Sequence, residues 1–241
     1  MPRRYDAVCF DMGYTLVWFY PSVEEIARQA WHDAGLDVTV EQLREAYSAV
    51  WEREDQDAAT FTFPATEAYD HEAEARRRRE LLYYLGHSDE ELLRRYTARL
   101  AEIYGAPGAL RLYDDVLPTL SSLQSAGYRL AIISNWSWNL KDRCSQVSIG
   151  SYFDVIMASA YAGCDKPNPD IFKQTLAQMG IAAARAVHIG DRYETDVIGA
   201  RAAGMDAIWL NRDGKPSDPD CTAVRDLREL LDLVERGKKI W

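Results

Sequence analysis

The chain has 241 residues, of which 47% are hydrophobic and 27% charged, and its formal net charge is −10. This composition excludes a disordered chain, which would contain fewer apolar residues for so much charge, and the length fits a core domain that carries a smaller insertion. The acidic balance argues against nucleic acid or an anionic membrane as the main partner, because both attract basic surfaces.

The first predicted strand is the apolar run Ala7–Phe10, and a helical region follows it. Residues 17–107 contain no convincing strand. They contain four segments of helical period: Ser22–Ala34, Val40–Ala58, Ala65–Leu85 and Ser88–Tyr104. Ser22 and Ser88 are the predicted N-caps, and Ser88 forms a predicted capping box with Glu91. We therefore expect an all-helical domain, residues 17–107, inserted after the first strand.

Beyond the insertion, short apolar runs alternate with helical segments. The predicted strands are Leu130–Ile133, Val155–Ala158, Ala186–Ile189 and Ala207–Leu210, and the predicted helices are Asp115–Ala126, Pro169–Met179 and Asp196–Ala203. The runs do not alternate apolar with polar residues, so we expect each strand to be covered on both faces, as in a parallel sheet. The pattern predicts a doubly wound α/β core domain formed by residues 1–16 and 108–241.

The cysteines and the N-terminal residues indicate where the protein works. The cysteines stand far apart, with no close pair: Cys9, Cys144, Cys164 and Cys221. This spacing favours buried free thiols over a zinc site or a disulfide framework. Asp6 and Asp11 interrupt the apolar residues near the start, so no signal peptide is predicted, and no run approaches the roughly 18 apolar residues of a membrane span. We expect a cytoplasmic protein that does not bind membranes.

Polar residues follow the predicted strands at the points where the strands end. They are, in chain order, Asp11, Ser134, Asn135, Lys166, Asp191 and Asp196. Any one of them is more often a turn or cap residue than a catalytic one. Because the carboxyl ends of parallel strands meet at one edge of the sheet, we expect all of them to converge there.

With this set of motifs the sequence resembles the haloacid dehalogenase (HAD) superfamily of hydrolases, in the branch whose helical cap is inserted just after the first strand. The resemblance covers nearly the whole chain. It rests on residues 10–16, on Ser134, on Lys166 and on residues 190–196, and also on residues 112–116 and 199–205. It implies a Rossmannoid core and hydrolase activity.

The resemblance also implies catalytic roles. Asp11 would attack phosphorus and form an aspartyl-phosphate that water hydrolyses. Ser134 would hydrogen-bond a phosphoryl oxygen, helped by the backbone N–H of Asn135. Lys166 would pair with Asp11 and with the phosphoryl group and offset charge in the transition state.

The resemblance further implies a magnesium ion, because negative charge must be offset before a carboxylate can attack a phosphate. The implied ligands are a carboxylate oxygen of Asp11, the backbone carbonyl of Gly13, and Asp191. Asp196 would support the metal through water or orient Lys166, and Thr15 would support the site.

One departure from the family pattern bears on activity. Most phosphatases of the family carry a second Asp two residues after the nucleophile, where this chain has Gly13. That side chain protonates the leaving group, so we expect a slower enzyme, and we expect Gly13→Asp to raise turnover. The departure leaves two alternatives to a phosphatase. One is a 2-haloacid dehalogenase. Dehalogenases of the family carry Tyr two residues after the nucleophile and then Gly, the reverse of Gly13-Tyr14 in this chain. The other is a slow or inactive phosphate-binding regulator.

The remaining features concern the pocket. Aromatic residues follow two of the predicted strands: Trp18, Phe19, Tyr20, Trp136 and Trp138. We favour a role in packing between the two domains over a role as an apolar wall around the leaving group. His188, inside a strand, is expected to be a satisfied core residue. Residues 17–107 hold 19 acidic and 10 basic side chains, so most of the net charge lies there. We expect a small phosphorylated metabolite as substrate, while its identity and the oligomeric state, a homodimer included, stay open.

Overall fold

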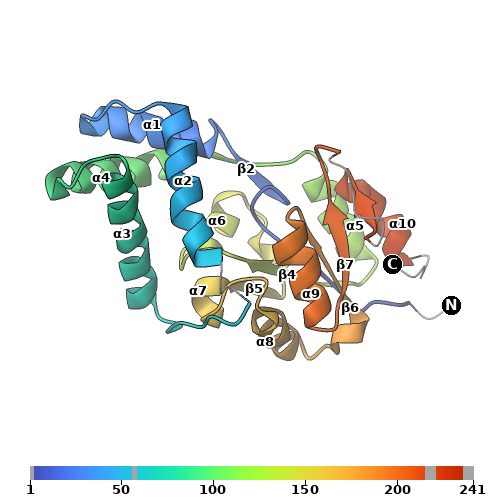
Figure 1. Ribbon diagram of the computed structural model, residues 1–241. Coiled ribbons are helices and arrows are strands. Elements are labelled where there is room, and N and C mark those ends of the chain that lie inside the picture. Colours follow the sequence, from blue (N-terminus) through green and yellow to red (C-terminus); the bar gives the residue numbers. More distant parts are fainter. Residues whose placement is uncertain (1–2, 56–58, 215–220, 236–241) are drawn as a thin grey trace. The chain divides into compact units, whose positions relative to one another are not determined.

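The computed structural model describes residues 3–55, 59–214 and 221–235. The chain divides into two compact units, of which one is α/β and the other mainly helical (Figure 1). The α/β unit comprises Met1–Val17, Ala58–Thr66 and Leu112–Trp241, and the helical unit comprises Trp18–Asp57 and Glu67–Arg111.

The α/β unit is built on a six-stranded sheet in which every neighbouring pair is parallel. The strands, in spatial order, are β5 (Val155–Ala158), β4 (Arg129–Ser134), β1 (Ala7–Phe10), β6 (Ala186–Gly190), β7 (Asp206–Leu210) and β8 (Ala223–Val224). The sequence predicts five of them to within a residue at each end. The sixth, β8, has two residues, too few to show a pattern. The predicted fold class is confirmed.

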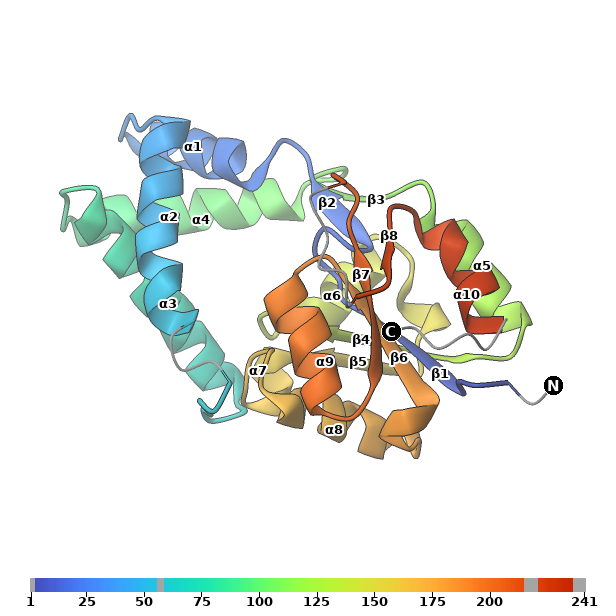
Figure 2. The same ribbon diagram turned by 45° about the vertical axis from the view of Figure 1, so that its right-hand side comes forward.

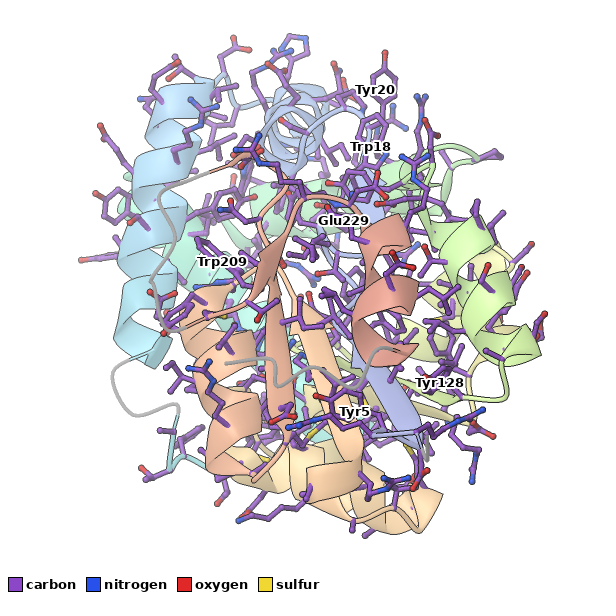
Figure 3. The ribbon with its side chains drawn as sticks, turned by 90° about the vertical axis from the view of Figure 1, so that its right-hand side faces the viewer. Tyr5, Trp18, Tyr20, Tyr128, Trp209 and Glu229 are labelled. Carbon is purple, nitrogen blue, oxygen red and sulfur yellow. The ribbon has the colours of Figure 1, made fainter. Side chains whose placement is uncertain are left out.

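Helices cover both faces of this sheet. They are α5 (Val116–Ser125), α6 (Leu140–Gln146), α7 (Ser159–Ala162), α8 (Pro169–Met179), α9 (Gly199–Ala202) and α10 (Leu230–Glu235). Figures 2 and 3 show α5 and α10 on one face of the sheet and α8 and α9 on the other. The central strands are buried along their whole length, which is why their sequences are apolar except for His188 in β6.

The helical unit contains α1 (Val23–Ala34), α2 (Val40–Asp55), α3 (Glu67–Tyr84) and α4 (Glu90–Gly105). Its core includes Trp31 and Tyr96, whose rings stack with centroids 3.6 Å apart. Ser22 is the N-cap of α1, as predicted, and accepts a hydrogen bond from the backbone N–H of Glu25. The predicted end of the second helix, at Ala58, lies outside the described residues.

Three local predictions in this region need correction. The N-cap of α4 is Asp89, not Ser88, and its carboxylate accepts from the backbone N–H groups of Glu91 and Leu92, so the capping box with Ser88 does not form. The segment predicted to be free of strands begins with β2 (Val17–Phe19), which pairs with β3 (Leu110–Leu112). Residues 59–66 group with the α/β unit, although they lie within the predicted insertion.

One predicted helix of the α/β unit also differs. The sequence predicts a single α-helix over Asp196–Ala203, but the chain forms a π-helical turn, Tyr193–Ile198, followed by the short helix α9. A wide turn of this kind is rare and often occurs at functional sites. Here it carries Asp196.

Within the described part of the chain, the helices are too short or too polar to traverse a lipid bilayer.

Candidate active site

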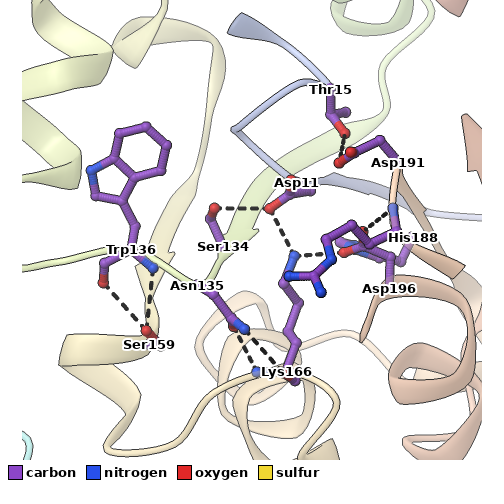
Figure 4. A network of polar contacts seen from close by, with 11 residues as sticks. Asp11, Thr15, Ser134, Asn135, Trp136, Ser159, Lys166, His188, Asp191 and Asp196 are labelled. Carbon is purple, nitrogen blue, oxygen red and sulfur yellow. Dashed lines mark hydrogen bonds and ion pairs between the residues drawn. The ribbon is translucent and has the colours of Figure 1, made fainter. Parts of the chain in front are cut away.

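The carboxylate of Asp11 lies at the carboxyl end of β1, the strand next to both β4 and β6 (Figure 4). Ser134 ends β4, and its hydroxyl donates to Asp11 Oδ1 at 2.8 Å. The Lys166 ammonium donates to the same oxygen at 2.7 Å. All three residues are nearly buried, with exposed fractions of 8% or less. A charge-assisted contact in such a setting is much stronger than on the surface.

The loop that carries Lys166 is held by Asn135. The Asn135 side-chain amide donates to the backbone carbonyl of Lys166 at 2.9 Å and accepts from its backbone N–H at 2.6 Å. Both polar ends of the Asn135 side chain are therefore used to position this loop. The sequence assigns substrate binding to Asn135 through its backbone N–H. That assignment stays a prediction, and the positioning role of the side chain is new.

Asp196 is the second anchor of Lys166. Its Oδ1 accepts from the Lys166 ammonium at 2.5 Å, and its Oδ2 accepts from the backbone N–H of Arg192 at 3.0 Å. The carboxyl group lies against Gly190, where a Cβ would stand 2.1 Å from Asp196 Cγ. Only glycine at position 190 leaves space for this arrangement. The π-helical turn thus brings Asp196 back over the end of β6.

His188 also contacts Asp196, with its Nε2 3.0 Å from Oδ1. The expectation of a satisfied core histidine is wrong in one respect, because the other ring nitrogen is buried without a hydrogen-bond partner among the described residues. One signal of this contact is visible in the sequence: a single ionisable residue within an otherwise apolar strand, three positions before Asp191.

Asp191 follows β6 and is supported from the first loop. The Thr15 hydroxyl donates to Asp191 Oδ1 at 3.4 Å, and the backbone carbonyl of Thr15 accepts from Arg212 at 2.8 Å. Arg212 also forms an ion pair with the buried carboxylate of Asp115 and lies over the ring of Tyr113. The sequence indicates Thr15 as a supporting residue but not Arg212 and Asp115, because nothing in their spacing connects them with residue 15.

The electrostatics of the cluster follow from burial and crowding. Burial alone would lower the pKa of the Lys166 ammonium, but the carboxylates of Asp11 and Asp196 outweigh it and raise that pKa. Burial opposes ionisation of Asp196, yet Lys166 and His188 hold its pKa below the ordinary value. Burial, with the charges of Asp11 and Asp196, raises the pKa of Asp191 to about 7. The single positive charge of the Lys166 ammonium does not offset the negative charge of three carboxylates.

The donor set fits a hard divalent cation. Each of three aspartates, Asp11, Asp191 and Asp196, offers an oxygen, and these oxygens lie within 4.8 Å of one another. Carboxylate oxygens are the ligands that Mg²⁺ prefers, and the excess negative charge is what a divalent ion would offset. Asp11 and Asp191, the predicted side-chain ligands, lie together here. The predicted contribution of the Gly13 carbonyl and the identity of the metal stay predictions.

The position where the family pattern carries its second Asp is open enough for a side chain. A Cβ at Gly13 would lie 3.5 Å from Cζ3 of Trp136, an ordinary van der Waals contact, and no closer atom limits it. Trp136 is held by its indole N–H, which donates to Asn139. Space alone therefore does not explain the glycine.

Comparison of the sequence with known proteins identifies the family to which this site belongs. The family model of the haloacid dehalogenase-like hydrolases matches residues 5–204. A glyceraldehyde 3-phosphate phosphatase from Methanopyrus kandleri is 34% identical over 140 residues, which cover 54% of this chain and 59% of that protein. A phosphoserine phosphatase from Thermus thermophilus is 32% identical over 124 residues, half of each chain. The match thus spans only about half to three fifths of these curated relatives.

A solved structure shows a similarity over almost the whole chain. The 2-haloacid dehalogenase from Pseudomonas syringae pv. Tomato DC3000 is 25% identical, with a TM-score of 0.69, and the alignment covers 97% of this chain and 100% of that protein. Proteins with two different chemistries therefore resemble this chain.

Proposed function

The chain belongs to the haloacid dehalogenase-like hydrolases, and we propose that it is a Mg²⁺-dependent phosphatase of small phosphorylated metabolites, acting through an aspartyl-phosphate. The observation that carries the proposal is the convergence of the carboxylate oxygens of Asp11, Asp191 and Asp196 within 4.8 Å, beside a buried lysine. Phosphoryl transfer requires concentrated negative charge on the nucleophile and the substrate to be offset together. The phosphatase names of the two curated relatives support the same chemistry.

In the first step, Asp11 Oδ1 attacks phosphorus while the bond from phosphorus to the leaving oxygen breaks. The Ser134 hydroxyl and the Lys166 ammonium both contact Oδ1, at 2.8 and 2.7 Å, so both donors are in place to bind a phosphoryl group bonded at that oxygen. The electron pair leaves with the substrate oxygen. In the second step, water attacks phosphorus, releases inorganic phosphate and restores the Asp11 carboxylate.

The leaving oxygen takes its proton from solvent, because Gly13 offers no acid. General acid help contributes about 10²–10⁴-fold to such steps. A slow enzyme therefore fits this site, as does a substrate whose leaving group is a weak base.

Asp11 and Asp191, with Asp196 alongside, would hold a magnesium ion, which would supply positive charge to offset that of the phosphoryl group. Of the protein's own groups, Lys166 supplies the remaining positive charge and is fixed by two carboxylates.

The test is phosphate release from p-nitrophenyl phosphate and a panel of small phosphorylated metabolites. We expect turnover with Mg²⁺, none with EDTA, and none in Asp11→Asn. Asp6→Asn is the matched control, because Asp6 lies in the same unit but pairs with Arg185 at a partly exposed position. It should retain turnover within about 2-fold, as substitutions away from buried networks usually do. Metal-independent turnover, or equal loss in both variants, would contradict the proposal.

The resemblance to a 2-haloacid dehalogenase favours a second candidate function, displacement of halide by the same Asp11. Its test is chloride release from 2-chloropropionate in the same preparation. Chloride release without Mg²⁺, with no phosphate release, would support it. Binding of phosphate without turnover in either assay would instead indicate a phosphate-binding regulator.

A further inference from the structure

His188 is a buried polar residue in the strand beside the nucleophile strand. It lies in β6, is fully buried, and is in register with Cys9 of β1 and Ala207 of β7. Its ring meets Phe172 of α8 edge-on, with centroids 5.1 Å apart. An imidazole in such apolar surroundings costs stability unless its polar atoms find partners. The partner it finds belongs to the active site.

The contacts fix the tautomer of His188. Nε2 lies 3.0 Å from Asp196 Oδ1, the atom that also accepts from the Lys166 ammonium. A carboxylate only accepts, so Nε2 carries the proton. Nδ1 is buried and has no partner among the described residues. A neutral ring leaves only a lone pair unmatched there, whereas a charged ring would bury an unpaired N–H. The geometry therefore assigns the Nε2–H form.

The same strand holds the Asp196 carboxyl group in two ways. His188 and Gly190 stand two residues apart in β6, so they face the same side of the sheet. Gly190 leaves space into which the carboxyl group fits, since a Cβ would lie 2.1 Å from Asp196 Cγ. His188 donates to that carboxyl group. Shape and hydrogen bonding thus select one orientation of Asp196.

The orientation of Asp196 determines where Lys166 lies. The ammonium is held between Asp196 Oδ1 at 2.5 Å and Asp11 Oδ1 at 2.7 Å. If the Asp196 carboxylate turned, the ammonium would follow it or lose one of two buried partners. We propose that His188 is a positioning residue of this site: by donating to Asp196, it fixes the carboxylate that holds Lys166 beside the nucleophile. The effect on turnover rests on the proposed phosphatase function, but the effect on Lys166 does not.

Two amide variants separate the hydrogen bond from simple packing. In His188→Gln the amide nitrogen reaches the position of Nε2, whereas in His188→Asn it reaches only the position of Nδ1. Both are polar and uncharged, so they differ chiefly in where the donor stands. His188→Leu and His188→Met remove the donor and keep an apolar side chain of similar size. Met is the variant to use if Leu does not fold, because its flexible side chain adapts to irregular space.

The measurements are crystal structures, thermal unfolding, and steady-state kinetics with p-nitrophenyl phosphate and Mg²⁺. We expect the apolar variants and His188→Asn to move the Lys166 ammonium away from Asp11 Oδ1. They should lower kcat by about 10-fold or more, the usual size of an effect on a supporting hydrogen bond. His188→Gln should keep the ammonium in place and retain most of the kcat.

The structures give an answer even if the wild-type protein releases no phosphate, so a failure of the proposed function is distinguishable from a failure of this inference. A Lys166 ammonium that stays against Asp11 in both His188→Asn and an apolar variant would overturn the inference. Equal displacement in His188→Gln and His188→Asn would also overturn it, because the role would then be packing of the ring.

Discussion

At position 13 the chain has no side chain where most phosphatases of the family carry a carboxylic acid. The structure shows no steric reason for this, because a Cβ would make only an ordinary contact with Trp136. The backbone at Gly13 is also outside the left-handed region that favours glycine. Position 13 can therefore accept a side chain, and the absence of a carboxylic acid there is a difference in chemistry from most phosphatases of the family.

This makes Gly13→Asp informative. We expect it to raise kcat for substrates with a basic leaving group by about 10-fold or more, because general acid help contributes about 10²–10⁴-fold when the acid is well placed. The measurement is a comparison of alkyl and aryl phosphates. Gly13→Asn, which has the same shape but no acid, is the control and should give no gain. If the two variants behave alike while both bind Mg²⁺, the missing-acid explanation is wrong.

Gly190 is a glycine of the opposite kind, required by packing. We expect Gly190→Ala to push the Asp196 carboxyl group out of its place, since the new Cβ would lie 2.1 Å from Cγ. Overpacking of this kind costs about 1–3 kcal/mol of unfolding free energy. Urea unfolding measures the loss, and Gly13→Ala is the matched control. A Gly190→Ala protein as stable as Gly13→Ala would contradict the close packing of Asp196 against β6.

At the scale of elements, the loop before α8, which carries Lys166, is hydrogen-bonded to a segment that lies far away in sequence. Asn168 is the N-cap of α8 and accepts from the backbone N–H of Asp170 at 3.0 Å. Its amide also donates to the backbone carbonyl of Phe61 at 3.3 Å. A backbone hydrogen bond from Phe63 to the Gly163 carbonyl, at 2.8 Å, lies close by. Residues 59–66 are thus tied to the loop that carries Lys166.

The two functions of Asn168 can be separated. We expect Asn168→Ala to lose about 0.5–2 kcal/mol of unfolding free energy, because the helix loses its cap. Asn168→Asp keeps the acceptor and should retain most of that stability, but it has no donor for the Phe61 carbonyl. Limited proteolysis should therefore cut residues 59–66 faster in Asn168→Asp than in wild type. If proteolysis of Asn168→Asp and the stability of Asn168→Ala both match wild type, the hydrogen bonds of Asn168 do not stabilise this region.

At the scale of the whole molecule, the four cysteines can be used to measure whether the chain is folded. All are buried and free. Burial raises the pKa of Cys9 and of Cys144 to about 12, and of Cys164 to about 11. Each of these three folded thiols therefore holds its proton in a pH range where the unfolded thiol loses it.

Two measurements follow from these thiols. Alkylation with iodoacetamide at pH 8 should be slow in the native protein and rapid in urea, because only the thiolate reacts and the folded protein has little of it. The free energy of unfolding should fall as pH rises above about 9, the ordinary thiol value, since the unfolded state then releases protons that the folded state keeps. Rapid native labelling of any of these three cysteines would place that thiol at the surface.

Most of the fold is determined by local patterns in the sequence. The mainly apolar runs at 7–10, 130–133, 155–158, 186–189 and 207–210 all lie in strands, because a strand covered on both faces is made mostly of apolar residues. The convergence of Asp11, Ser134, Lys166 and Asp196 follows from their place at the strand ends or in the segments that follow them. The sequence predicts that they meet, and the structure brings them together.

The tertiary structure decided what local patterns do not contain. Asp89 rather than Ser88 caps α4, because the cap depends on where the backbone turns and not on residue type alone. The link between Arg212 and Thr15 joins residues 197 positions apart. The contact of His188 with Asp196 depends on a π-helical turn where the sequence predicts an ordinary α-helix. The positions of the strands along the chain are set by hydrophobic burial, which a sequence displays, whereas the order of the strands in the sheet comes from the folded structure. The orientation of each polar side chain is set by the hydrogen-bond donors and acceptors around it. Because many of these come from distant parts of the sequence, only the folded structure shows them.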